Sequence, residues 1–300
     1  MPFLSVLLCT RNRGEKVRNA VDSILTNSFT DFELLIVDQS SDGKTKDVIA
    51  SYPDPRIRYI HTKTTGLSRS RNIAIRESKA EIVVFTDDDC ICDREWLAAI
   101  VAEYGRDPSL MGVYGRVLPY GEQREEMHCH CLIDSMETRS ADQPVIPYKI
   151  LGHGNNMSFK KDVFLTAGLY IESLGAGTWM KGGEDTELTY RALRKGMKFA
   201  YSPAPLVYHD NWMSKDKAAE LENSYILAGV AVFTKYALKF DKKAFGYVVE
   251  RGKEIVWRIV YHLKPGNREG LRPAATRLKW FVIGLLMGVK YLFVVEPKLN

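Results

Sequence analysis

The first hundred residues alternate between two hydrophobic periods. Continuous apolar runs predict buried strands at 3–8, 33–37, 57–60 and 81–85. Apolar residues at helical spacing predict helices near 17–25, 71–78 and 96–104. Strands that alternate with helices indicate an α/β fold, with a mostly parallel sheet flanked by helices.

The middle of the chain is less regular. Residues 115–150 contain several prolines, so loops and short strands are expected there. Residues 151–158 are rich in glycine and amides, which suits a loop whose backbone approaches a ligand. Helical spacing then resumes and places Glu184 and Asp185 in a first turn, where acidic residues also complement the helix dipole whatever their function.

After Asp210 the pattern becomes helical. Helices are expected over about 216–238 and 242–263, followed by a mostly apolar segment at 278–295. That last segment is too short and too charged for a transmembrane helix, so an interfacial helix is the better prediction. The predicted division is a domain at 1–210, with halves 1–114 and 115–210, and a helical region at 211–300.

Charge is distributed unevenly along the chain. The net charge is +5, but residues 1–189 hold 22 Lys and Arg against 28 Asp and Glu, whereas residues 190–300 hold 20 against 9. A basic end suits a polyanion, either nucleic acid or bilayer headgroups. Tryptophans and apolar runs among the basic residues favour the bilayer, so we expect no nucleic-acid partner.

Polar clusters follow three of the predicted strands. They are Thr10–Arg13, Asp38–Gly43 and the carboxylates Asp87–Asp89. Ligands of parallel α/β sheets bind outside the carboxyl ends of the strands, so these clusters predict one binding rim.

The carboxylate triplet raises a specific question, because adjacent like charges repel one another. It is either a solvated acidic turn or a site for a divalent cation, Mn²⁺ or Mg²⁺. A cation at a sheet end suits a nucleotide-diphosphate leaving group, with added positive charge from Arg11, Arg69 and Arg71. Asp38 could accept a hydrogen bond from a base, and Asp185 could be the carboxylate that activates an attacking hydroxyl.

Six motifs occur in the order of a known family. The chain resembles glycosyltransferase family 2, inverting nucleotide-sugar transferases of the Rossmann-like GT-A fold, over roughly residues 3–210. The matching motifs are "SVLLCTRNR", "LLIVDQSSDG", "GLSRSRNIAI", "VVFTDDDC", "GNNMSFKK" and "GGEDTELTYRAL".

The resemblance implies roles for individual residues. The nucleotide sugar would be bound by Thr10, Arg11, Asn12, Asp38, Gly66, Arg69, Asp87 and Asp88. Asp87 and Asp89 match the outer residues of the family's DXD motif, and Asp89 would bind the metal. For Asp88, the middle residue, the alternative to a contact with the nucleotide sugar is a side chain that simply faces solvent.

Further roles concern the acceptor side. Asp185 matches the presumed general base, and His209 a late histidine that in some relatives reaches the metal or diphosphate; an ordinary core or surface histidine is the alternative. The donor-sugar and acceptor region would include Asn155, Asn156 and Glu184. For His153, a hydrogen-bonded loop histidine is the expected state.

Two absences narrow the prediction. The only glutamines are Gln39, Gln123 and Gln143, and none begins the QxxRW motif of processive synthases, so transfer of a single sugar is favoured. The His128–Cys131 cluster has the wrong spacing for a zinc knuckle, and reduced thiols are expected instead.

The predicted function is therefore metal-dependent, inverting transfer of one sugar, with a UDP-sugar as the expected donor, to a glycan or lipid-linked acceptor. The alternatives are a nucleotidyltransferase and a non-catalytic nucleotide-binding scaffold at a membrane. Five cysteines, an odd number, and an N-terminus without a signal-peptide pattern predict a cytoplasmic protein.

Peripheral attachment to the inner face of the membrane is the prediction for the tail. Its apolar positions would enter the bilayer, and Trp280 and Tyr291 would lie at the headgroup level. Anionic lipid would be met by Arg258, Lys264, Arg268, Arg272 and Arg277. Packing of this helix on the protein itself or on a second subunit is the alternative.

Overall fold

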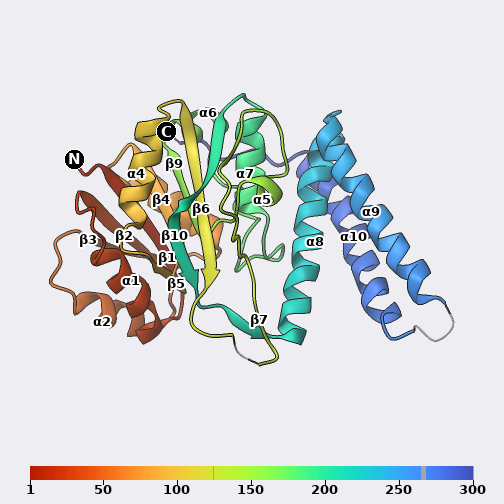
Figure 1. The fold of residues 1–300 in the computed structure, drawn as a ribbon, viewed down its shortest axis with the longest axis horizontal. Coiled ribbons are helices and arrows are strands. Elements are labelled where there is room, and N and C mark those ends of the chain that lie inside the picture. Colours follow the sequence, from red (N-terminus) through yellow and green to blue (C-terminus); the bar gives the residue numbers. More distant parts are fainter. Residues whose placement is uncertain (124, 265–267, 300) are drawn as a thin grey trace.

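The chain folds into a central sheet with helices on both faces and three long helices at one side (Figure 1). This computed structural model describes residues 1–123, 125–264 and 268–299. Its strands are β1 (Leu4–Thr10), β2 (Phe32–Asp38), β3 (Ile57–His61), β4 (Ile82–Asp87), β5 (Cys90–Cys92), β6 (Leu110–Pro119), β7 (Met127–Cys129), β8 (Arg139–Ala141), β9 (Asn156–Lys160), β10 (Lys198–His209) and β11 (Trp212–Ser214).

The helices follow the periodicity of the sequence, with small shifts at their ends. They are a 3₁₀ turn η1 (Gly14–Lys16), α1 (Val17–Leu25), α2 (Lys44–Ala50), α3 (Leu67–Glu77), α4 (Trp96–Arg106), α5 (Pro147–Ile150), α6 (Asp162–Ala167), α7 (Glu184–Leu193), α8 (Lys215–Ala237), α9 (Lys242–His262) and α10 (Leu271–Tyr291). The sequence did not predict α2, because only one turn of apolar residues marks it.

Parallel pairing holds in the first half of the sheet. The strand order is β3-β2-β1-β4-β9-β6-β10-β5, with β8 beside β10. β1, β2, β3 and β4 pair in parallel as predicted, whereas β9 runs antiparallel to both β4 and β6. The prediction of an α/β sheet is confirmed, and its second half is mixed in direction.

Alternate residues of β1 enter two separate cores. Leu4, Val6 and Leu8 pack with α1, α2 and α4 on one face of the sheet. Leu7 packs with α3, α6 and α7 on the other. Both faces are therefore covered, and the ligand-accessible part of the sheet is its edge at the strand ends.

The three C-terminal helices pack on the sheet domain beside α7. Tyr190 of α7 contacts Phe233 of α8 with ring centroids 5.0 Å apart. Gly284 and Gly288 of α10 lie directly on α8, since a Cβ at Gly288 would come within 2.4 Å of Thr234. None of the described helices combines the length and the hydrophobicity needed to cross a bilayer.

Part of the predicted membrane role of the tail is wrong. Tyr291 is buried, and its hydroxyl bonds to Ser173, while Trp280 is partly buried among α8 and α9 residues. The buried Tyr291 is therefore not placed for a headgroup layer, whereas Trp280 keeps partial exposure. The chain after α10 also returns to the sheet domain, where the backbone N–H of Leu169 donates to the carbonyl of Pro297 at 2.7 Å. Beside it, Glu296 pairs with the buried Lys235 of α8 at 2.8 Å.

Candidate active site

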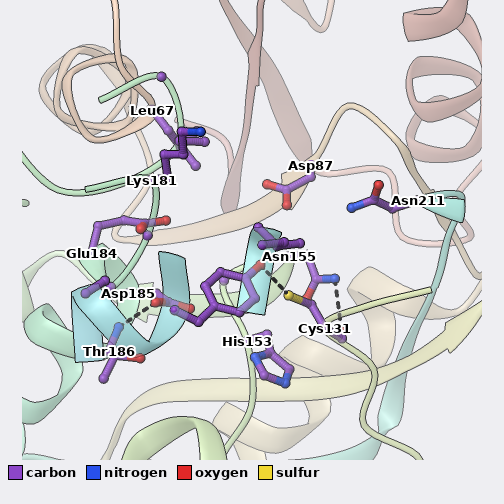
Figure 2. A pocket seen from close by; sticks show the side chains of 18 of the residues that line it. Leu67, Asp87, Cys131, His153, Asn155, Lys181, Glu184, Asp185, Thr186 and Asn211 are labelled. Atoms are coloured by element: carbon purple, nitrogen blue, oxygen red, sulfur yellow. Dashed lines mark hydrogen bonds between the residues drawn. The ribbon is translucent and has the colours of Figure 1, made fainter. Parts of the chain in front are cut away.

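A cavity of about 760 Å³ opens at the ends of β1 and β4, next to the N-terminus of α7. Figure 2 shows Asp87, Asp185 and Asn155 around it, contributed by β4, by α7 and by the loop before β9. Most of the predicted site residues line this one cavity: Thr10, Arg11, Asn12, Gly66, Asp87, Asp88, Asp89, Asn155, Glu184, Asp185 and His209.

Arg71 of α3 joins the two sides of the cavity. Its guanidinium lies 3.3 Å from Asp87 and 3.1 Å from Glu184, and it donates a hydrogen bond to the carbonyl of Gly154. The Arg71 side chain is only 3% exposed, and its pair with Glu184 is buried, whereas Asp87 is 33% exposed toward the cavity. The sequence predicted that Arg71 adds positive charge to a diphosphate. In the structure its guanidinium pairs with the carboxylates of Asp87 and Glu184 instead.

The middle carboxylate does not face solvent. Asp88 is buried and accepts a hydrogen bond from Arg13 at 2.8 Å, and the same guanidinium contacts Asp89 at 2.9 Å. Burial raises the pKa of Asp88 to about 6, although Arg13 opposes the rise. The expected alternative, a solvated Asp88, is therefore wrong, because Arg13 compensates the charge inside the protein.

Asp89 also meets His209 from the end of β10. The Nε2 atom of His209 lies 3.3 Å from Asp89 Oδ1, and Nδ1 lies 2.9 Å from the carbonyl oxygen of His130. Burial lowers the pKa of His209, but hydrogen bonding to Asp89 outweighs it and raises the pKa to about 10. His209 is 3% exposed, so the alternative of a surface histidine is wrong, and a buried histidine bonded to Asp89 is what the structure shows.

These atoms fit a divalent cation. A carbonyl that accepts from Nδ1–H orients the ring and presents Nε2, the arrangement common for metal-ligating histidines. Asp89, Cys90 and His209 are the group in the described chain whose ligand atoms lie within 4.8 Å of one another. Burial keeps Cys90 a neutral thiol by raising its pKa, so Asp89 and His209 are the fitting donors, of the oxygen and nitrogen kinds that suit Mn²⁺.

Asp185 differs from the other acids of the cavity. Among the described residues it makes no ion pair, and its Oδ1 accepts from the backbone N–H of Thr186 at 2.6 Å. Gly183, with φ of +85°, starts the helix, and Gly154 allows close approach, since a Cβ there would lie 3.1 Å from Asp185 Oδ2. A carboxylate without a cationic partner remains available to accept a proton.

Glu184 has a different environment from its neighbour. Burial and the adjacent Asp185 raise its pKa to about 7, although Arg71 opposes the rise. Asn155 has a buried Oδ1 with no hydrogen-bond partner in the described chain, which suits contact with a ligand.

Three predicted residues lie outside the cavity lining. Asp38 is fully buried and accepts hydrogen bonds from Ser40 and Tyr59. Arg69 pairs with Glu172 near the surface at 2.8 Å. Asn156 is buried, accepts from Trp96 and donates to two backbone carbonyls, so the structure gives it a packing role rather than the predicted donor-sugar or acceptor contact.

Asp38 still acts on the site through a neighbour. Ser40, which donates to Asp38, accepts a hydrogen bond from the backbone N–H of Asn12 at 2.7 Å. Asn12 has a left-handed backbone with φ of 54°, so this contact fixes a strained turn in the cavity wall.

Several lining residues had no individual role in the predicted site, although Arg13 and Gln39 belong to the predicted strand-end clusters. They are Arg13, Gln39, Lys181 and, from α8 to α10, Tyr225, Tyr247, Arg251 and Arg277. His153, expected as an ordinary loop histidine, also lines the cavity, and burial lowers its pKa. Arg277 was expected at a lipid surface, but it pairs with Glu222 beside the cavity.

The His128–Cys131 cluster does not bring its ligand atoms together into one metal site among the described residues. Cys129 donates to the carbonyl of His209, and Cys131 contacts the hydroxyl of Tyr225. All five cysteines are free thiols, which confirms the prediction of reduced cysteines at these positions.

The sequence as a whole matches a known family. The family model described as "Glycosyl transferase family 2" matches residues 5–165, more than half of the chain. The chain belongs to glycosyl transferase family 2. The matched range contains most of β1, the acidic triplet and the Asn155 loop.

Individual family members are similar over part of their length. A glucosyl-dolichyl phosphate glucuronosyltransferase of Haloferax volcanii is 26% identical over 182 residues, covering 57% of each chain. A poly(ribitol-phosphate) β-N-acetylglucosaminyltransferase, TarP, of Staphylococcus aureus is 32% identical over 123 residues. That match covers 38% of this chain and 37% of TarP, so the chain spans little more than half of the first relative and little more than a third of TarP.

Solved structures confirm the GT-A fold. A mannosyltransferase from Pyrobaculum calidifontis, in complex with GDP-Man and Mn²⁺, superposes with a TM-score of 0.61 at 17% identity. The match covers 96% of this chain and 87% of the mannosyltransferase chain, so the similarity includes the C-terminal helices as well as the sheet. TarS of S. aureus gives a TM-score of 0.60 over 96% of this chain.

Proposed function

We propose that this protein transfers one sugar from a nucleotide-diphosphate sugar to an acceptor hydroxyl, with metal assistance and inversion at the anomeric carbon. The observation that carries the proposal is the shared cavity of the Asp89–His209 pair and the unpaired carboxylate of Asp185. One end can hold a cation against a diphosphate, and the other can accept a proton.

The reaction needs one proton transfer and one displacement. Asp185 accepts the proton of the acceptor hydroxyl, whose oxygen bonds to the anomeric carbon as the bond to the diphosphate oxygen breaks. Attack from the face opposite the leaving group inverts the configuration. Mn²⁺ or Mg²⁺ bound by Asp89 and His209 would supply positive charge to the departing nucleoside diphosphate.

The cavity side chains have separate tasks in this proposal. Arg11 and Lys181 line the cavity and add positive charge beside the diphosphate. Arg13 holds Asp88 and Asp89 in place. Arg71 contacts both Asp87 and Glu184 and fixes their positions, so Asp185 lies at a set position relative to the strand ends.

The donor and acceptor are proposed from chemistry and similarity. A UDP-sugar remains the expected donor; solved neighbours hold GDP-Man in one case and UDP in another. A lipid-linked or glycan acceptor agrees with a relative named for glucosyl-dolichyl phosphate. Asp185 in the same cavity favours sugar transfer over nucleotidyl transfer, which would leave this carboxylate without a task.

Two helices carry exposed apolar stripes that suit a membrane surface. On α9 the stripe is Phe245, Val249, Val256, Trp257, Val260 and Leu263. On α10 it is Leu278, Val282, Leu286 and Val289, while Phe281 and Leu285 pack inward. Exposed apolar side chains at helical spacing are typical of an interaction face.

The charge around these stripes favours anionic lipid as the partner. The exposed basic residues are Lys253, Lys264, Arg268, Arg272, Lys279 and Lys290. Each basic side chain near an anionic surface contributes about 1 kcal/mol. We therefore propose peripheral attachment through α9 and α10, on the cytoplasmic face of a membrane.

We predict that Asp89→Asn weakens binding of UDP in the presence of Mn²⁺ by roughly 100-fold, because loss of a metal ligand removes several kcal/mol. Asp42→Asn, a change in an exposed acid outside the cavity lining, should bind like the wild type. Calorimetric titration measures both. Wild-type affinity in Asp89→Asn would exclude Asp89 as a metal ligand.

We predict that Asp185→Asn lowers turnover by roughly 10²–10⁴-fold, the usual contribution of a positioned general base. Nucleotide affinity should stay unchanged, since the amide keeps the shape of the side chain. Release of UDP from the UDP-sugar, with acceptor or with water, reports the rate. If turnover stays near the wild-type value, the base lies elsewhere, and Glu184→Gln becomes the variant to measure.

We predict that Trp257→Glu combined with Leu286→Glu abolishes cosedimentation with vesicles that contain phosphatidylglycerol. These side chains are 62% and 67% exposed, and burying each contributes about 1.5–3 kcal/mol. Leu165→Glu, at a 62% exposed position on α6, is the matched control and should sediment like the wild type.

Truncation of α10 is a poor test of attachment, because Pro297 contacts the sheet domain and Glu296 pairs with the buried Lys235 of α8. A wild-type protein that stays in solution with anionic vesicles at low salt would contradict membrane attachment. A dimer that the double variant dissociates would instead make this face a contact between two copies.

A further inference from the structure

The cavity continues past Asp185 onto the C-terminal helices. The far wall, defined here as the helical wall, consists of Tyr148 of α5, Tyr225 of α8, Tyr247 and Arg251 of α9, and Arg277 of α10. The diphosphate end of the cavity lies at the strand ends, so this wall is on the side of the attacking group. It contains three tyrosines and two arginines.

The tyrosines are held in fixed positions. Tyr225 packs on the Gly182–Gly183 turn that precedes Asp185, since a Cβ at Gly182 would lie 3.2 Å from its ring. Gly229 makes room for Tyr247 on α8, because a Cβ there would lie 2.6 Å from the Tyr247 hydroxyl. Preorganised aromatic rings next to a reacting group suit the apolar faces of a sugar ring.

Arg251 is positioned by the aromatic residues around it. Its guanidinium lies 5.7 Å from the centroid of Tyr247 and donates to the Tyr148 hydroxyl at 3.2 Å. It also pairs with Glu254 at 2.7 Å, but Glu254 does not line the cavity. A guanidinium has five N–H donors, more than these contacts use, so Arg251 retains donors for a ligand.

Arg277 approaches the cavity from the neighbouring helix. It contacts Glu222 at 2.6 Å, and the Glu222 side chain is 48% exposed. An exposed pair of this kind contributes at most about 1 kcal/mol, so an anion with better geometry displaces the carboxylate readily. Arg251 and Arg277 both line the cavity, and the planar fork of each guanidinium can bind a phosphate in a bidentate way.

The opposite side of α9 explains how such a ligand arrives. Tyr247 and Arg251 line the cavity, whereas Val249 and Val256 are exposed on the apolar stripe. Residues two positions apart on a helix point about 200° away from each other, so one helix has a cavity side and a membrane side. A phosphate that joins a lipid to a sugar would reach the helical wall from that membrane.

We propose that the helical wall is the acceptor subsite and that it binds a phosphate-bearing acceptor, with the phosphate at Arg251 and Arg277 and a sugar ring against the tyrosines. This inference rests on the proposed sugar transfer. It adds the chemical class of the acceptor and the residues that select it.

The test uses geranyl monophosphate as the probe, with geraniol and glucose 1-phosphate for comparison, on the full-length protein with UDP and Mn²⁺ present. The proposal predicts that geranyl monophosphate binds at least 10-fold more tightly than geraniol. Arg251→Gln combined with Arg277→Gln should remove at least 10-fold of that affinity. Stronger binding of geranyl monophosphate than of glucose 1-phosphate assigns a lipid-linked phosphate; equal binding assigns a phosphate on a free glycan.

Arg258→Gln is the matched control. Arg258 lies on the same helix and pairs with the same Glu254, but it does not line the cavity. If Arg251→Gln impairs folding, Arg277→Gln alone, a change in a partly exposed pair, should still weaken phosphate binding several-fold. Affinity for UDP and Mn²⁺ is measured on every variant and should remain unchanged.

Two results would overturn the acceptor subsite. One is equal binding of the phosphorylated and uncharged probes. The other is wild-type affinity for geranyl monophosphate in both arginine variants. If the wild-type protein does not bind UDP in the presence of Mn²⁺, the proposed sugar transfer itself is contradicted. Failure of the acceptor subsite and failure of the proposed function are therefore distinguishable.

Discussion

A single buried guanidinium links the two sides of the active site. Arg71 extends from α3 and contacts Asp87 at the end of β4 and Glu184 at the start of α7, two elements almost a hundred residues apart in the chain. Removing one partner of a buried ion pair leaves an uncompensated charge, which costs about 3–5 kcal/mol. The relative position of the acidic end of β4 and the start of α7 thus depends on this side chain.

The same principle explains how three consecutive carboxylates are tolerated. Arg71 compensates Asp87, Arg13 compensates Asp88, and Asp89 lies between Arg13 and His209. Asp185 is outside this pairing among the described residues. The charge arrangement therefore separates the acids that are paired with cationic side chains from Asp185, to which we assign the role of proton acceptor.

Periodicity predicted the strands and long helices because burial of one face imposes a repeat that is visible in the sequence. The carboxyl-end rule then placed Thr10 and Asp87 in one cavity. Asp38 and Asn156 were assigned to ligand contacts, but both are buried among protein partners. Sequence spacing places a side chain at a strand end without showing whether a neighbour such as Ser40 or Trp96 already occupies its polar atoms.

The helical wall was beyond sequence reasoning for a different reason. Tyr247, Arg251 and Arg277 reach the cavity because α8, α9 and α10 pack closely, and that packing depends on Gly284 and Gly288 fitting against α8. Hydrophobic periodicity reflects only local structure, so it cannot predict a contact between residues so far apart in the chain. Tyr291 was likewise predicted to be a headgroup anchor from its position in the sequence, but in the structure it is buried against Ser173.

Equilibrium unfolding in urea of Arg71→Met and Arg69→Met tests the central role of Arg71 most directly. The two arginines lie on the same helix, but Arg69 is 42% exposed in its pair with Glu172. The account predicts that Arg71→Met lowers the free energy of unfolding by about 3–5 kcal/mol, and that Arg69→Met changes it by no more than about 0.5 kcal/mol. Equal stability of the two variants would contradict it.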